Sequence, residues 1–159
     1  MNAHLLFFIL GLIFVILIGI GVYIILVFNK LKTYKNEVDR LWNLLRIKIE
    51  NQFKYINSNF ESIIFDNKEY LKEIIDKYML LAYTEDIMTT YVELEKVIDN
   101  IGESQIKVNF LKENEEIDKL KIEYNNVLLK YNNTINIMTN KFIADAFKFK
   151  QGTYFISKK

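Results

Sequence analysis

The chain has 159 residues, of which 51% are hydrophobic and 26% are charged, with 21 basic and 20 acidic side chains. It contains no cysteine and one histidine, which excludes disulfides, zinc ribbons and thiol catalysis, so we expect no metal and no cofactor. The net charge of +1 provides no general field to attract nucleic acid. Phosphate-binding glycine loops and hydrolase motifs are also missing, so we expect neither a small-molecule substrate nor enzymatic activity.

The first charged side chain is Lys30, and an apolar run begins at Leu5 and ends at Phe28. As a helix this run rises about 36 Å, enough to cross a hydrocarbon core of about 30 Å. A cleaved signal peptide is the alternative, but it would need a basic start and a shorter apolar core. We therefore expect residues 1–29 to be an uncleaved transmembrane anchor whose partner is the lipid bilayer.

Four basic residues directly follow the apolar run: Lys30, Lys32, Lys35 and Arg40. The side of a span that is richer in Lys and Arg usually faces the cytoplasm. The sequence therefore predicts a single-pass protein of the cell membrane, with its amino terminus outside and its body in the cytoplasm.

Beyond the run, apolar residues recur with gaps of three and four, the spacing of a buried helix face. The first stripe is Leu31, Tyr34, Val38, Leu41, Leu45, Ile49, Phe53, Ile56, Phe60 and Ile63. Since no glycine or proline lies between Asn29 and Ile101, we expect this helix to continue directly from the membrane helix. We expect a break near residues 65–67, where Asp66 or Asn67 can cap a new helix.

A second stripe runs from Leu71 to Ile101, and we expect Gly102 to stop its helix. Its weak point is Thr84-Glu85-Asp86, where a charged residue stands on the apolar face. The alternatives there are a kink, a frayed loop or a division into two shorter helices. The two carboxylates have no accompanying nucleophile or base, so we interpret them as a local break rather than an acid–base site.

The third stripe has heptad spacing, with Ile117, Tyr124, Tyr131 and Met138 every seven residues and Leu120, Val127 or Leu128, and Ile135 between them. This pattern is typical of antiparallel helices in a bundle or coiled coil, with the aromatic rings in the core. The predicted fold class is all-α: a transmembrane helix followed by an antiparallel bundle of three to four long helices. Acidic residues between 113 and 118 spread around this helix and are expected to be solvated rather than to bind a cation.

Two Tyr-Asn pairs, Tyr124-Asn125 and Tyr131-Asn132, stand seven residues apart. An alanine, an aromatic-x-aromatic segment and a closing Tyr-Phe follow them, and an asparagine and a tryptophan follow the apolar run: Ala144, Phe147, Phe149, Tyr154, Phe155, Asn29 and Trp42. In order and spacing these residues resemble the LemA family over nearly the whole chain. The resemblance implies an anchor at residues 1–29, a helical bundle at residues 30–159 and no established catalytic activity.

The chain departs from the family pattern at several positions. Asn51-Gln52 and Asn57 stand where the family usually has an arginine pair and a proline, and Met138-Thr139 replaces a Phe-Pro step. Lys148 replaces the glycine of the aromatic-x-aromatic segment. Loss of the arginine pair could remove a contact that the family makes.

The Tyr-Asn pairs have two interpretations. In the first, the tyrosine rings fill the heptad seam while Asn125 and Asn132 form hydrogen bonds to a neighbouring helix and fix its register. In the second, these asparagines and the nearby carboxyl-terminal segment form a docking groove for a partner. We expect the first.

The last segment alternates lysines with aromatic residues, a composition that can bind anionic lipid. After three long passes, however, the end of the chain would lie roughly 50 Å from the anchor. Contact with the membrane would need a fourth pass, made by splitting the second helix near Thr84. We expect the segment instead to fold back and cap the end of the bundle.

The expected function is that of a non-enzymatic, membrane-anchored scaffold or organiser that acts through an unknown protein partner or through self-association. The alternative is an accessory subunit of a membrane enzyme, transporter or protease complex. Self-assembly would give homo-oligomers, whereas an accessory role would give a defined hetero-complex.

Overall fold

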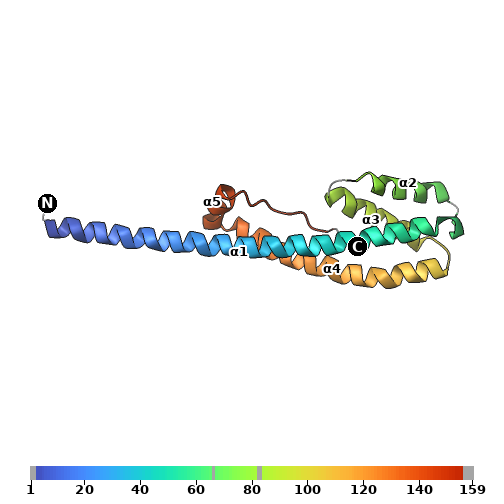
Figure 1. Ribbon diagram of the computed structural model, residues 1–159, viewed down its shortest axis with the longest axis horizontal. Helices are drawn as coiled ribbons and strands as arrows, with labels where there is room; N and C mark the ends of the chain where they lie inside the picture. The colour runs from blue at the N-terminus through green and yellow to red at the C-terminus, as the bar shows by residue number, and fades with distance from the viewer. Residues whose placement is uncertain (1–2, 66, 82–83, 156–159) are drawn as a thin grey trace. The chain divides into compact units, whose positions relative to one another are not determined.

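The computed structural model describes residues 3–65, 67–81 and 84–155, and these form helices and connections without a β-strand, as the all-α prediction requires (Figure 1). The elements are α1 (Ala3–Ser58), a 3-10 helix η1 (Phe60–Ser62), α2 (Lys68–Met79), α3 (Thr84–Asp99), α4 (Gln105–Asn136) and α5 (Met138–Ala146). The chain divides into two compact units. Unit 1 comprises Met1–Asn36 and Leu129–Gly152, and unit 2 comprises Glu37–Leu128 and Thr153–Lys159.

Helix α1 passes through residues 29 and 30 without a break, so the predicted continuation of the apolar run into the next helix is confirmed. Every residue from 4 to 20 is exposed, whereas Val27 and Leu31 are buried in unit 1. Among the described helices, α1 is the one that is long and apolar enough to cross a membrane. Its exposed apolar turns are therefore a candidate membrane span.

Helix α1 ends at Ser58, earlier than the predicted break near residues 65–67. The Ser58 hydroxyl donates to the Lys54 carbonyl, and the Asn59 amide donates to the Tyr55 carbonyl, both over 2.8 Å. Short polar side chains that bond the backbone in this way compete with helix continuation. The new helix α2 is capped by Asn67, whose side chain accepts from the Tyr70 amide, and Asp66 lies outside the described residues.

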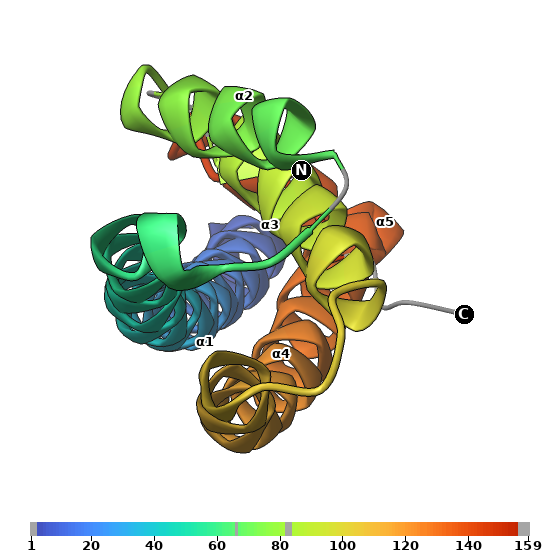
Figure 2. The ribbon, with the colours of Figure 1, turned by 90° about the vertical axis from the view of Figure 1, so that its right-hand side faces the viewer.

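The predicted apolar stripes build most of the core of unit 2, and Phe110, which lies outside them, joins it. The fully buried side chains of this core include Leu41, Leu45, Ile49, Phe53, Leu71, Tyr91, Leu94, Phe110, Ile117 and Leu128. Phe53 of α1 stacks on Tyr78 of α2, with ring centroids 3.8 Å apart and planes at 8°. In Figure 2, α3 lies between α2 and α4. Four helical segments thus share one apolar interior in this unit.

The second predicted helix is divided into α2 and α3, one of the three alternatives for its weak point. Glu85 and Asp86 occupy the first turn of α3, where carboxylates favour the helix dipole. The predicted stop at Gly102 is wrong, because α3 ends at Asp99 and Gly102 does not have a positive φ. Instead the Asn100 side chain donates to the Lys96 carbonyl over 2.9 Å and occupies one of the last acceptors of the helix.

The third stripe is buried at Ile117, Tyr124, Leu128 and Tyr131, but Met138 is 80% exposed and does not join the core as predicted. The reason is a turn at Ile137, with φ −62° and ψ 125°, which separates α4 from α5. Helix α5 buries Asn140, Ile143 and Ala144 within unit 1 and leaves Met138 on its outer side.

Within unit 1, α5 contacts the first half of α1. The Tyr23 hydroxyl donates to Asn140 Oδ1 over 2.6 Å and lies 2.7 Å from the Thr139 hydroxyl. The Phe28 ring lies 4.7 Å from the Phe147 ring, measured between centroids. Within unit 1, the segment that follows α4 therefore lies against the first half of α1.

Lys148 ends α5 in a left-handed conformation, with φ 59°. The Phe149 amide donates to the Ala144 carbonyl over 2.8 Å, the long bond that closes a helix through a left-handed residue. This conformation costs a residue with a Cβ about 1 kcal/mol of free energy, whereas glycine adopts it freely.

We expect Lys148→Gly to stabilise the end of α5 by about 1 kcal/mol, equivalent to about fivefold slower exchange of the Phe149 amide hydrogen. The measurement is hydrogen exchange followed by mass spectrometry in detergent micelles. Lys150→Gly is the matched control, because Lys150 does not have a positive φ and should gain nothing. If the Phe149 amide of Lys148→Gly exchanged as fast as in the unsubstituted chain, or faster, the proposed backbone strain at Lys148 would be contradicted.

Candidate functional site

Two asparagines of α4 bind the main chain of residues 150–155, which we call the tail. In unit 1, Asn132 accepts from the Gly152 amide and donates to the Gly152 carbonyl, both over 3.1 Å. In unit 2, Asn125 makes the same pair of bonds with Phe155, over 2.8 and 2.9 Å. The predicted hydrogen bonds to a neighbouring helix are therefore wrong, since these amides hold an extended segment.

The spacing of the asparagines matches the spacing of their partners. Seven residues of α-helix rise about 10.5 Å. Gly152 and Phe155 are three residues apart, and three extended residues span about 10 Å. A side-chain amide carries both N–H donors and a carbonyl acceptor, so each asparagine can bond the N–H and the C=O of one tail residue, as a neighbouring strand would.

Side chains of unit 2 hold the tail at Thr153 as well. The Tyr124 hydroxyl donates to the Thr153 carbonyl over 3.0 Å, and the Thr153 hydroxyl donates to Glu85 Oε1 over 2.6 Å. Burial raises the pKa of Tyr124 to about 12, and the nearby Asp39 carboxylate adds to the shift, so this hydroxyl remains a donor at neutral pH. The tail folds back, as expected, but it lies against α4 and the first turn of α3 rather than capping the bundle.

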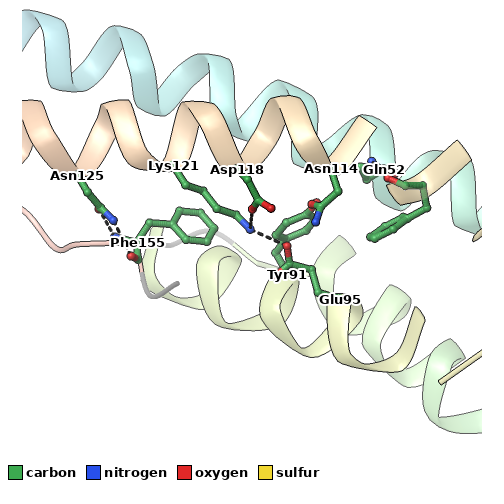
Figure 3. Close-up of polar contacts among 9 residues, drawn as sticks. Gln52, Tyr91, Glu95, Asn114, Asp118, Lys121, Asn125 and Phe155 are labelled. Carbon is green, nitrogen blue, oxygen red and sulfur yellow. Dashed lines mark hydrogen bonds and ion pairs between the residues drawn. The ribbon is translucent and has the colours of Figure 1, made fainter. Parts of the chain in front are cut away.

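A buried ion pair lies beside the last tail residue (Figure 3). The Lys121 ammonium is 2.6 Å from Glu95 Oε1 and 2.9 Å from Asp118 Oδ1, and the Lys121 and Glu95 side chains are 7% and 5% exposed. The same ammonium lies 5.1 Å from the ring centroid of Phe155 and 4.9 Å from that of Tyr91. Carboxylates and aromatic faces together replace the water that this cation loses.

Tyr91 extends the polar cluster toward the start of α4. Its hydroxyl donates to Asn114 Oδ1 over 2.5 Å. Burial raises the pKa of Tyr91 well above its usual range, and the Glu95 and Asp118 carboxylates raise it further, so the phenol is held neutral. Glu95, Asp118 and Lys121 also border a groove of about 260 Å³ between α3 and α4. These groups are arranged for charge pairing and hydrogen bonding within the fold.

The residues of the family pattern fall into two groups of contacts. In unit 2, the Trp42 and Tyr124 rings lie 6.2 Å apart, and Asn125 holds the buried Phe155. In unit 1, Phe149 and Phe147 pack on Phe28, while Asn132 holds the tail. Ala144 and Tyr131 are buried in unit 1, whereas Asn29 and Tyr154 are exposed.

Gln52 has a clear structural role. It is 4% exposed and donates to the Phe110 carbonyl over 3.1 Å. A neutral amide thus satisfies a main-chain acceptor of α4 from the interior of unit 2.

Lys121 and Glu95 were not predicted as site residues, although the apolar pattern of the sequence contains a signal for both. Lys121 stands four residues after Ile117 and three before Tyr124, so it lies on the buried stripe of α4. Glu95 stands four residues after Tyr91 and next to Leu94, both fully buried. A lysine and a glutamate on two core stripes predict a buried pair, because neither charge is stable alone in an apolar interior.

The acidic residues 113–118 are exposed at all four carboxylate positions, as expected for a solvated face. Glu116 and Glu113 pair with Lys48 of α1, over 2.6 and 3.7 Å. Within the described part of the chain, no group of three or more potential ligands could hold a metal ion.

Comparison of the chain with protein families, with curated proteins and with solved structures gives no match.

Replacing Asn125 by leucine should release the tail, because the amide and carbonyl of Phe155 then lose their partners while the branching and the number of side-chain heavy atoms are kept. Each hydrogen bond contributes about 1 kcal/mol, so we expect the Phe155 amide to exchange at least about fivefold faster. Asn126→Leu, on the exposed neighbour, is the matched control. If the Phe155 amide of Asn125→Leu exchanged at an unchanged rate, the proposed role of Asn125 in binding the tail would be contradicted.

Lys121→Met should lower the free energy of unfolding of unit 2 by about 3 kcal/mol, because Glu95 is left buried without a cation. The double variant Glu95→Leu/Lys121→Met should regain most of this loss, since apolar pairs can replace buried ion pairs. The measurement is denaturant unfolding in micelles, followed by the fluorescence of Trp42, the single tryptophan. Lys119→Met, an exposed position on α4, is the control. A double variant no better than Lys121→Met would refute the pairing.

Proposed function

We propose that the chain is a single-pass membrane protein with a LemA-like helical domain, acting as a non-enzymatic scaffold or organiser through protein–protein or self-association. The observation that carries this proposal is the continuous helix α1, whose first turns are apolar and exposed and whose later turns are buried in helical packing. An anchor at residues 1–29 would hold the domain of residues 30–159 at the surface of the cell membrane.

The orientation that we propose places the amino terminus outside and the helical domain in the cytoplasm. Its support is the basic flank of the span, which begins with Lys30, Lys32 and Lys35, while no basic side chain other than His4 precedes the span.

The proposal of a scaffold is supported by the roles of the polar side chains in the candidate site. Asn125 and Asn132 hold the tail, and Lys121 pairs with Glu95 and Asp118. These interactions stabilise the helical domain. The scarcity of cysteine and histidine in the composition also favours association over catalysis.

An apolar surface at the end of α2 offers a place for such association. Met79 and Leu80 are adjacent, and they are 68% and 86% exposed. Met79 also borders a groove of about 310 Å³ that is lined by Phe53, Tyr78 and Ile87, among others. Large exposed apolar side chains beside a groove are typical of protein contact sites. The alternative function, an accessory subunit of a membrane enzyme, transporter or protease complex, would use the same surface.

We expect the chain extracted in mild detergent to form complexes larger than a monomer. Leu80→Glu should lower the fraction of chain in these complexes, because burying a carboxylate in an apolar contact costs free energy. Native mass spectrometry measures both the size and the composition. Glu73→Lys, an exposed position on α2, is the control. Homo-oligomers would support the scaffold, a defined hetero-complex would support the accessory subunit, and a monomer in every extract would contradict both.

A further inference from the structure

Helix α5 has an apolar outer face that contrasts with its buried face. Asn140, Ile143 and Ala144 are buried within unit 1. On the other side, Met138 and Phe142 are one turn apart and are 80% and 74% exposed. These two large side chains give a helix of nine residues an exposed apolar face that contact with an apolar environment would stabilise.

The contacts of α5 fix its position along α1. Asn140 is held by the Tyr23 hydroxyl over 2.6 Å, and its own amide donates to the Thr134 carbonyl over 2.9 Å. The rings of Phe147 and Phe149 lie 4.7 and 5.8 Å from the ring of Phe28. Helix α5 therefore lies beside residues 23–28 of α1.

Residues 23–28 are the end of the candidate span. The fully exposed stretch of residues 4–20 rises about 26 Å, close to the roughly 30 Å thickness of a hydrocarbon core. Tyr23 stands seven residues before Lys30, which is about 10 Å along the helix. With Lys30 among the lipid headgroups, Tyr23 and Asn140 lie at the depth that apolar faces of interfacial helices reach, about 5–10 Å below them.

The residues on and after α5 include positively charged side chains, which are favourable near lipid phosphate groups. Lys141, Lys148 and Lys150 are exposed, and Asp145 is the one acidic residue on α5. Long lysine side chains can extend toward phosphate groups while the helix lies in the boundary layer.

We propose that α5 is a second membrane contact, an interfacial helix whose Met138 and Phe142 side chains lie at the boundary between headgroups and acyl chains. The occupant of this face is the lipid itself, because α5 is bound to the very turns of α1 that end the apolar run. The inference depends on the proposed membrane span of α1.

The test uses the full chain in vesicles of phosphatidylcholine with a minority of phosphatidylglycerol. A single cysteine replaces Phe142, in a chain without native cysteine, and carries an environment-sensitive fluorophore. Lipids with a nitroxide near the headgroup or near the chain end then quench it according to depth. We expect stronger quenching by the shallow nitroxide, and the same result for Met138→Cys on the same face.

Two further positions separate failure of the inference from failure of the span. Val15→Cys lies in the middle of the apolar run and should be quenched most by the deep nitroxide. Asn36→Cys, which is exposed on α1 in unit 1 and lies about 9 Å beyond Lys30 along the helix, should be quenched less than position 142 by both nitroxides. Quenching at position 15 without quenching at 142 and 138 would overturn the inference and leave the anchor intact. Shielding of position 142 from water without lipid quenching would point to a protein surface instead, and no quenching at position 15 would refute the anchor as well.

Discussion

The exposed apolar turns at the start of α1 impose the strongest physical constraint on the molecule. Each large apolar side chain left in water forgoes about 1.5–3 kcal/mol of burial free energy, and residues 4–20 consist almost entirely of such side chains. Because α1 continues without a break, the surroundings of its first turns also determine those of Tyr23 and Phe28, and therefore of α5. If residues 4–20 lie in lipid, α5 lies near the membrane surface, because it is bound to the next turns of α1.

The second constraint is the main chain of the tail, which is extended and has no neighbouring strand among the described residues. Peptide groups that are partly buried need hydrogen-bond partners, and here side chains provide them at Gly152, Thr153 and Phe155. The seven-residue repeat of the asparagines was visible in the sequence, but the sequence did not show that their hydrogen-bond partner is the main chain of the tail. The rise over two helical turns equals both the spacing of a heptad register and that of three extended residues, so the pattern alone could not distinguish a neighbouring helix from a tail.

The sequence was sufficient for features that depend on periodic burial. It predicted the stripes of α1 and α4, the passage from the apolar run into the next helix and the weak point between α2 and α3. It was insufficient where single polar side chains compete with the backbone. Asn59 and Asn100 end helices through local hydrogen bonds, while Gly102 was given that role on its residue type alone. Lys148 in the left-handed region is a similar case, because its residue type argues against the conformation that it adopts.

The buried pair of Lys121 and Glu95 links the packing of unit 2 to the proposed function. Such a pair adds little net stability compared with apolar side chains, but it penalises any arrangement of α3 and α4 that separates the charges. The ring of Phe155 lies over the same ammonium, so the end of the tail contacts the buried pair directly. The pair thus favours one arrangement of α3, α4 and Phe155 within unit 2, which would give the proposed scaffold a defined surface for selecting its partners.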